Sequence, residues 1–216
     1  MTTTIFLCYL GTFIFVFFLY TVGMILVAGL GNKGEEYENT RHNTGFIVLD
    51  YIAGAKDWNE SGKANALYKK VGTGKKEIEF LKPMNFMNNS GTSIAYAAKK
   101  HKLKPEKVVV IYDDMDLPIG RMKISFNRSS GGHNGVESII KNLKTEGFLR
   151  IRVGISPHTP TGKLKKPSGE KAVLGFLLKD FKDAEIAELK KISKKIKEAI
   201  DVFVTDGKEK MMSLYN

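Results

Sequence analysis

The feature that most constrains the fold is a run near the middle of the chain, KVVVIY at residues 107–112. From its second residue onward it is apolar at odd and even positions alike, so a β-strand made from it would be apolar on both faces. Such a strand has to be covered on both sides, which happens when helices lie on either face of a mostly parallel sheet. The run therefore predicts an α/β fold with residues 107–112 as a central strand.

From Met24 onward the chain alternates between strand and helix patterns. Short apolar runs bounded by Gly, Pro, Asn or Asp predict further strands at residues 24–29, 77–82, 121–126 and 149–155. Helical spacing of apolar residues and capping signals predict helices at residues 43–53, 90–102, 134–143 and 184–204. We expect a single-domain three-layer sandwich over residues 24–216, with a mixed, mostly parallel central sheet and helices on both faces. Residues 159–170, rich in Pro, Gly and Lys, predict a polar loop.

Residues 1–23 do not fit this domain. Residues 5–22 are almost entirely apolar, which makes them a candidate for a membrane span. They lack the basic start and the cleavage pattern of a secretory signal, and a membrane helix ending at Val22 would leave almost no linker before the first strand. We therefore expect that Met24 is the true start and that residues 1–23 are an extension outside the domain. The alternative is a genuine membrane anchor.

The charge and the single cysteine limit the partners and the chemistry. The chain has 34 Lys and Arg against 23 Asp and Glu, a formal net charge of +11, which favours an anionic partner such as nucleic acid. A Lys-rich solvated surface is the alternative. Cys8 is the only cysteine, so an intrachain disulfide and an all-cysteine zinc site are excluded. A reducing compartment, the cytoplasm, fits this best.

Polar residues gather in the turns that follow the predicted strands. The first turn, GLGNKG at residues 29–34, superficially matches a dinucleotide fingerprint, but no acidic residue ends a second strand about 20 residues later. It does carry Asn32, with His42 ten residues further on. A second Asn-rich segment, KPMNFMNNSG at residues 82–91, supplies amides suited to hydrogen bonding with peptide or ribose, and helix capping is the alternative there.

Two further segments carry groups that suit catalysis. Asp113, Asp114 and Asp116 follow the central strand, where an acid could orient a histidine; a Mg²⁺ site is the alternative. SSGGHNG, at residues 129–135, opens a predicted helix whose free N–H groups could bind a phosphate or an oxyanion. His42 and His133 each lie beside an Asn in a Gly-flanked turn, and either is a candidate general base. Because the chain has no G-x-S-x-G motif and Cys8 lies outside the domain, we expect direct attack by water.

Five stretches taken together resemble the bacterial type of peptidyl-tRNA hydrolase, in that family's order and spacing, from Met24 to about Asn216. They are GLGNKGEEYENTRHNTGF, KPMNFMNNSG, YDDMDLPIG, SSGGHNG and FLRIRVGI. The resemblance implies hydrolysis of the ester that links a peptide to the 3′ end of tRNA, by a cytoplasmic monomer with no metal or organic cofactor and no stable protein partner. A membrane would be a partner only if residues 1–23 are real.

The resemblance also implies roles for individual residues. His42 resembles the base that activates water, and Asp113 the acid that orients it. Asn32, Asn88 and Asn134 resemble the amides that hold the peptide and the terminal nucleotide. Tyr37 and Met87 resemble residues of the cleft wall near the peptide, and His133 resembles a residue at the rim of the cleft. The implied contacts with phosphates of the tRNA acceptor arm come from Lys123, Arg128 and Arg152.

Two positions depart from the family pattern. Lys33 stands where the family usually has Pro, and Ser125 stands where relatives usually carry a second basic residue after Lys123.

The alternative function is that of a non-catalytic RNA-binding protein of the same fold, such as the related RNA-splicing factors of plastids. Because His42, Asp113 and the three asparagines are all present, the enzyme is the favoured interpretation.

Overall fold

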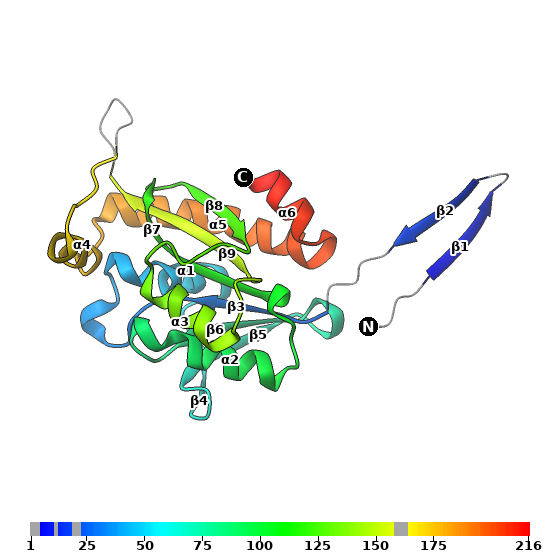
Figure 1. The fold of residues 1–216 in the computed structure, drawn as a ribbon, viewed down its shortest axis with the longest axis horizontal. Coiled ribbons are helices and arrows are strands. Elements are labelled where there is room, and N and C mark those ends of the chain that lie inside the picture. The colour runs from blue at the N-terminus through cyan, green and yellow to red at the C-terminus, as the bar shows by residue number, and fades with distance from the viewer. Residues whose placement is uncertain (1–4, 11–12, 19–22, 158–163) are drawn as a thin grey trace.

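The computed structural model describes residues 5–10, 13–18, 23–157 and 164–216. Its main sheet has seven strands in the order β4-β5-β6-β3-β7-β9-β8 (Figure 1). The strands are β3 (Ile25–Gly29), β4 (Asn59–Ser61), β5 (Ala66–Val71), β6 (Ile78–Pro83), β7 (Val108–Pro118), β8 (Met122–Phe126) and β9 (Leu149–Ser156). The helices are α1 (Thr44–Ala53), α2 (Ser90–Lys100), α3 (Asn134–Leu143), α4 (Glu170–Leu177), α5 (Asp183–Asp206) and α6 (Lys208–Tyr215).

The predicted three-layer sandwich is confirmed. Strands β6, β3, β7 and β9 are parallel and form the middle of the sheet, while β4, β5 and β8 add antiparallel strands at its edges. Helices α1 and α5 pack on one face of the sheet, and α2 and α3 pack on the other. One apolar cluster lies between the sheet and each pair of helices. The four residues from Val108 to Ile111 are fully buried, as a central strand apolar on both faces requires.

The structure also contains elements that the sequence patterns did not predict. Strands β4 and β5 and helices α4 and α6 were missed, and β7 continues beyond residue 112 to Pro118. The burial pattern of β5 shows why: only its first residue, Ala66, is fully buried, so no clear apolar alternation reveals the strand. Part of the polar loop expected at residues 159–170 lies outside the described residues, and Glu170 already begins α4.

Near the N-terminus, β1 (Ile5–Leu10) and β2 (Phe13–Phe18) pair with each other in an antiparallel sheet separate from the main one. Across the described parts of the chain, no helix has both the length and the apolar character needed to span a membrane.

Two glycines set the distance between α1 and the sheet. A Cβ atom on Gly45, in the first turn of α1, would lie 2.2 Å from the backbone nitrogen of Leu30 and 2.4 Å from the carbonyl oxygen of Ile111. A Cβ atom on Gly29 would in turn lie 2.4 Å from the carbonyl oxygen of Gly45. Helix α1 therefore packs directly against the end of β3 and against β7, and this contact fixes the position of the turn that precedes the helix.

We expect Gly45→Ala to destabilise the fold by about 1–3 kcal/mol or more, because the added methyl group meets backbone atoms that cannot move independently. Thermal unfolding of the full chain measures the change. Gly175→Ala in α4 is the matched control: its Cβ meets nothing within 4 Å, so helix propensity alone predicts an unchanged or slightly higher midpoint. Equal midpoints for Gly45→Ala and the parent would contradict this account of the packing.

Candidate active site

His42 lies directly above the end of the central strand. It belongs to a short 3₁₀ turn, η2 (Arg41–Asn43), that runs into α1, and it is 8% exposed. Its Nδ1 atom lies 3.1 Å from each carboxylate oxygen of Asp113, which is in β7 and is also buried. Residues 71 positions apart in the chain thus form the pair that the family resemblance implies.

The pair shifts the pKa of both members. Burial lowers the pKa of His42, but the charge of Asp113 and its hydrogen bond together outweigh burial and raise the pKa above its ordinary value. Burial of Asp113 would raise its pKa, but His42 and His133 outweigh this and hold it well below its usual range. The carboxylate is therefore ionised at neutral pH, and it stabilises a positive charge on His42.

His133 makes contacts with Asp113 and with the start of α3 that the sequence did not predict. Its Nε2 atom lies 3.1 Å from Oδ1 of Asp113, so two histidines share one carboxylate. Its Nδ1 atom accepts hydrogen bonds from the backbone N–H groups of Gly135 and Val136. These N–H groups were expected to be free for a phosphate or an oxyanion, and that expectation is wrong because a side chain of the protein occupies them.

The acidic cluster of Asp113, Asp114 and Asp116, which lies within β7, does not fit the alternative of a magnesium site. Asp114 pairs with Arg152, and Asp116 pairs with Lys166, so each of these carboxylates already faces a cation of the protein. Donor atoms of His42, Asp113 and His133 lie within 4.8 Å of one another. A metal there would have to displace the hydrogen bonds that join Asp113 to both rings.

Asn32 has a buried, bridging position. Its side-chain oxygen accepts a hydrogen bond of 2.8 Å from the backbone N–H of Met87, which links the turn after β3 to the turn after β6. Asn43 holds the backbone of Asn32 from the other side: its oxygen accepts from the N–H of Asn32, and its amide donates to the carbonyl. The sequence analysis did not predict a role for Asn43 in the site. Its position next to His42 in a polar turn is the sequence feature that could have indicated such a role.

The other predicted contact residues lie at several depths. Asn88, in η4 (Met87–Asn89), and Asn134, the first residue of α3, are exposed, while Tyr37 at the end of η1 (Glu35–Tyr37) is half-buried. Met87 is buried, and its Sδ atom would lie 2.6 Å from a Cβ on Gly135. Met87 therefore joins the turn that carries Asn88 to the start of α3.

An open cleft of about 1040 Å³ adjoins the His42–Asp113 pair. The predicted residues that line it are His42, Asp113, Lys123, Arg128, His133, Asn134 and Arg152, whereas Asn32, Tyr37, Met87 and Asn88 are not part of its lining. Lys123 and Arg128 are exposed and have no ion-pair partner among the described residues. Val173, Leu174 and Leu177 of α4 form an apolar wall. The cleft thus joins a cationic surface to an apolar one beside the histidine.

Arg41 is a second residue that the sequence analysis missed. It is 3% exposed, donates to the backbone carbonyls of Lys179 and Asp180, and forms an ion pair of 2.8 Å with Glu185. Its guanidinium group also lies 4.8 Å from the ring centre of Phe176. Arg41 therefore fastens the segment between α4 and α5 to the turn that carries His42. The partners lie about 140 positions away, and no local pattern reveals them.

Comparisons with known proteins show that the chain is similar to one family along most of its length. Residues 26–216 match the family model described as peptidyl-tRNA hydrolase. A peptidyl-tRNA hydrolase of Desulfitobacterium hafniense is 39% identical over 193 residues, which cover 89% of this chain and 100% of the relative. One from Aquifex aeolicus is 42% identical over 79% of this chain and 84% of its own. The crystal structure of the enzyme from Acinetobacter baumannii matches with a TM-score of 0.77 at 25% identity, covering 90% of this chain and 95% of the other.

Proposed function

The chain belongs to the peptidyl-tRNA hydrolase family and therefore hydrolyses the ester bond of peptidyl-tRNA; we propose that His42 is the general base of this reaction and that Asp113 orients it. The observation that carries the proposal is the buried contact between His42 Nδ1 and both oxygens of Asp113. Because a carboxylate accepts a hydrogen bond, Nδ1 carries the proton and Nε2 is left as the basic atom of a residue that lines the cleft.

The proton movements follow from this arrangement. Nε2 of His42 takes a proton from water as the water oxygen attacks the ester carbonyl, and Asp113 stabilises the imidazolium that forms. Collapse of the tetrahedral intermediate breaks the bond to the 3′ oxygen of the terminal ribose, and His42 returns the proton to that oxygen. The products are a free carboxylic acid and a tRNA with a free hydroxyl group, and no metal or organic cofactor takes part.

Side-chain amides are the proposed contacts of the substrate. The first-turn N–H groups of α3 at Gly135 and Val136 are occupied, so the exposed amides of Asn134 and Asn88 are the better donors to the oxyanion and the peptide. One well-placed donor of this kind is worth about 3–4 kcal/mol in the transition state. Asn32 and the buried Met87 fix the relative positions of the turns that carry Asn88 and Asn134. The half-buried Tyr37 is a proposed contact of the peptide outside the cleft, and His133 stands beside Asp113.

The acceptor arm of the tRNA is the proposed partner of the cationic side of the cleft. Lys123 and Arg128 are free to contact phosphates, and Arg152 contributes a charge that Asp114 partly neutralises. Ser125 also lines this side of the cleft, at a position where family members usually have a second basic residue. Phosphate contacts of this kind position the tRNA without reading its sequence.

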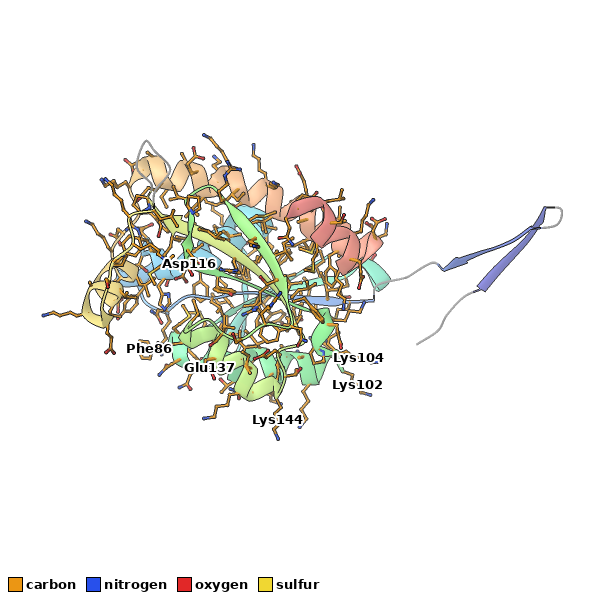
Figure 2. All side chains as sticks on the ribbon, turned by 45° about the horizontal axis from the view of Figure 1, so that its top comes forward. Phe86, Lys102, Lys104, Asp116, Glu137 and Lys144 are labelled. Carbon is orange, nitrogen blue, oxygen red and sulfur yellow. The ribbon has the colours of Figure 1, made fainter. Side chains whose placement is uncertain are left out.

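We expect Lys123→Ala and Arg128→Ala each to weaken tRNA binding, raise KM and leave kcat unchanged. Each should reduce the slope of log K against log salt concentration by about 1, because one fewer counterion is released. Binding titrations at several salt concentrations measure the slope. Lys104→Ala is the matched control; Figure 2 shows Lys102 and Lys104 together, well apart from Asp116 at the end of β7. An equal effect of all three substitutions would contradict a specific phosphate surface.

Hydrolysis of an N-acetylated aminoacyl-tRNA by the full chain tests the proposed function. Release of free tRNA together with the N-acetyl amino acid is the expected result. A chain that begins at Met24 should cleave equally well, because the family model begins at residue 26 and β1 and β2 pair only with each other in a separate sheet. Binding of tRNA without ester cleavage would instead favour the non-catalytic RNA-binding alternative. We further propose that the protein is a monomer in the cytoplasm. Sedimentation of the full chain checks the oligomeric state.

A further inference from the structure

We propose that His133 is a positioning residue: it holds the carboxylate of Asp113 in place for His42 and does not exchange protons with the substrate. This inference rests on the proposed function of the His42–Asp113 pair. It departs from the expectation that His133 contacts substrate, and it follows from the partners of its two ring nitrogens.

The Nδ1 atom of His133 is an acceptor. It lies 3.2 Å from the backbone nitrogen of Gly135 and 3.3 Å from that of Val136. A backbone N–H can only donate, so Nδ1 must present its lone pair to both groups. His133 thus serves as the N-cap of α3, a role usually filled by Ser, Thr, Asp or Asn.

The Nε2 atom is consequently the donor. In a neutral imidazole one nitrogen carries the proton, and with Nδ1 accepting, that nitrogen is Nε2. Nε2 lies 3.1 Å from Oδ1 of Asp113, where an N–H donates to an ionised oxygen. The ring is also packed against Tyr112, with ring centres 4.7 Å apart at an interplanar angle of 66°. Both nitrogens and one side of the ring are therefore engaged by the protein.

Asp113 receives N–H donors from two imidazole rings, but only one of these rings keeps a nitrogen for chemistry. His42 uses Nδ1 on Asp113 and has Nε2 left, whereas His133 has neither nitrogen left. The same tautomer leaves no lone pair on Nε2 of His133 for a metal, so the His42–Asp113–His133 cluster is a hydrogen-bonded unit and not a metal site. His133 therefore acts on the reaction through Asp113: it fixes Oδ1 and shares the negative charge that His42 experiences.

His133→Asn separates this role from helix capping. Asn is among the preferred N-cap residues, so α3 keeps its cap, but the shorter side chain does not reach Asp113. We expect thermal stability close to that of the parent, kcat lower by about 10–100-fold, the range for a lost hydrogen bond to a charged group, and an unchanged KM. The acid limb of the kcat/KM profile should move to higher pH, because the carboxylate charge is then directed at His42 alone.

A double-mutant cycle shows whether His133 acts through Asp113. In an Asp113→Asn background, the further change His133→Asn should cost little, because the charge on which it acts is already gone. A substrate contact would lower activity by the same factor in both backgrounds and would raise KM. Full parent kcat in His133→Asn would also overturn the inference and leave His133 as a cap alone.

The tautomer provides a test independent of activity. Nitrogen-15 NMR of the full chain, at a pH where the ring is neutral, should show a protonated Nε2 and an unprotonated Nδ1 for His133. The reverse tautomer would overturn the inference even in an active enzyme. If the parent protein fails to cleave N-acetyl aminoacyl-tRNA, the proposed function fails, and the tautomer still decides whether His133 is locked between α3 and Asp113.

Discussion

His42→Asn should lower kcat for ester hydrolysis by about 10²–10⁴-fold, the usual contribution of a general base. The amide of Asn cannot take a proton from water at neutral pH, and no other described side chain in the cleft presents an unoccupied imidazole nitrogen. Single-turnover cleavage of N-acetyl aminoacyl-tRNA measures the loss. Binding of tRNA should stay near the parent value, because His42 is not one of the cationic residues of the cleft. Thermal stability should fall, because the buried Asp113 loses the hydrogen bond from Nδ1 of His42.

The remaining described histidine outside the cleft, His101, provides the control. Its Nε2 atom lies 3.0 Å from a carboxylate oxygen of Glu79, a buried residue near the start of β6. His101→Asn should reduce stability, because it leaves Glu79 without a partner of the same reach, and it should leave kcat unchanged. If His42→Asn cleaves at the parent rate while folded, water is activated by another group and the proposed mechanism is wrong.

Asp113→Asn should lower kcat by an amount on the order of 10²–10⁴-fold, for a different reason. Both oxygens of Asp113 face Nδ1 of His42, so an amide N–H at one of these positions opposes the Nδ1 proton and favours the wrong tautomer. The loss should appear in kcat with little change in KM, because the residue lies beneath His42 and is buried.

The pH profile of the same variant carries a second expectation. In the parent, His42 must be neutral to act, and Asp113 raises its pKa, so kcat/KM rises as pH passes through a value above about 6.5. In Asp113→Asn the charge that raises the pKa is gone while burial still lowers it, so the acid limb should move to lower pH. A limb at the parent position would show that another group controls the profile.

Stability should follow the same two groups in opposite directions. The depressed pKa of Asp113 contributes stability that is present above about pH 4 and is lost as pH falls further. The raised pKa of His42 contributes stability that is present below about pH 6.5 and is lost as pH rises through the folded value. Asp113→Asn should therefore flatten the dependence of the unfolding free energy on pH across both ranges.

The sequence predicted those strands and helices whose burial produces a local pattern of apolar residues. The run at residues 107–112 and the apolar stripe of α5 were recognised because burial imposes a period on each of them. Strand β5 and helix α6 were missed, because each leaves much of its surface exposed and takes its place from its neighbours. For the candidate site, the strand-end rule for α/β sheets indicated only that an acid there could orient a histidine, and the pairing of His42 with Asp113 was implied by the family resemblance.

Other contacts of the site could not be predicted from patterns. The bond from His133 to Asp113 depends on how far α3 lies from β7, and the partners of Arg41 come from the segment between α4 and α5. Both are set by tertiary packing between distant segments. The expectation of free N–H groups at the start of α3 was wrong because a histidine side chain can itself cap the helix.

The order of strands in the main sheet also has a consequence during synthesis of the chain. Strand β3 is made first but lies in the middle, and its residue Leu26 pairs with Val108, more than 80 positions later. At the usual rate of about 5–20 residues per second, the partner strand follows roughly 4–16 s behind. Until then an apolar strand has no completed sheet to enter, and we expect the nascent chain to be exposed to aggregation. We therefore expect the enzyme to fold slowly after synthesis by the same translation machinery whose peptidyl-tRNA it later hydrolyses.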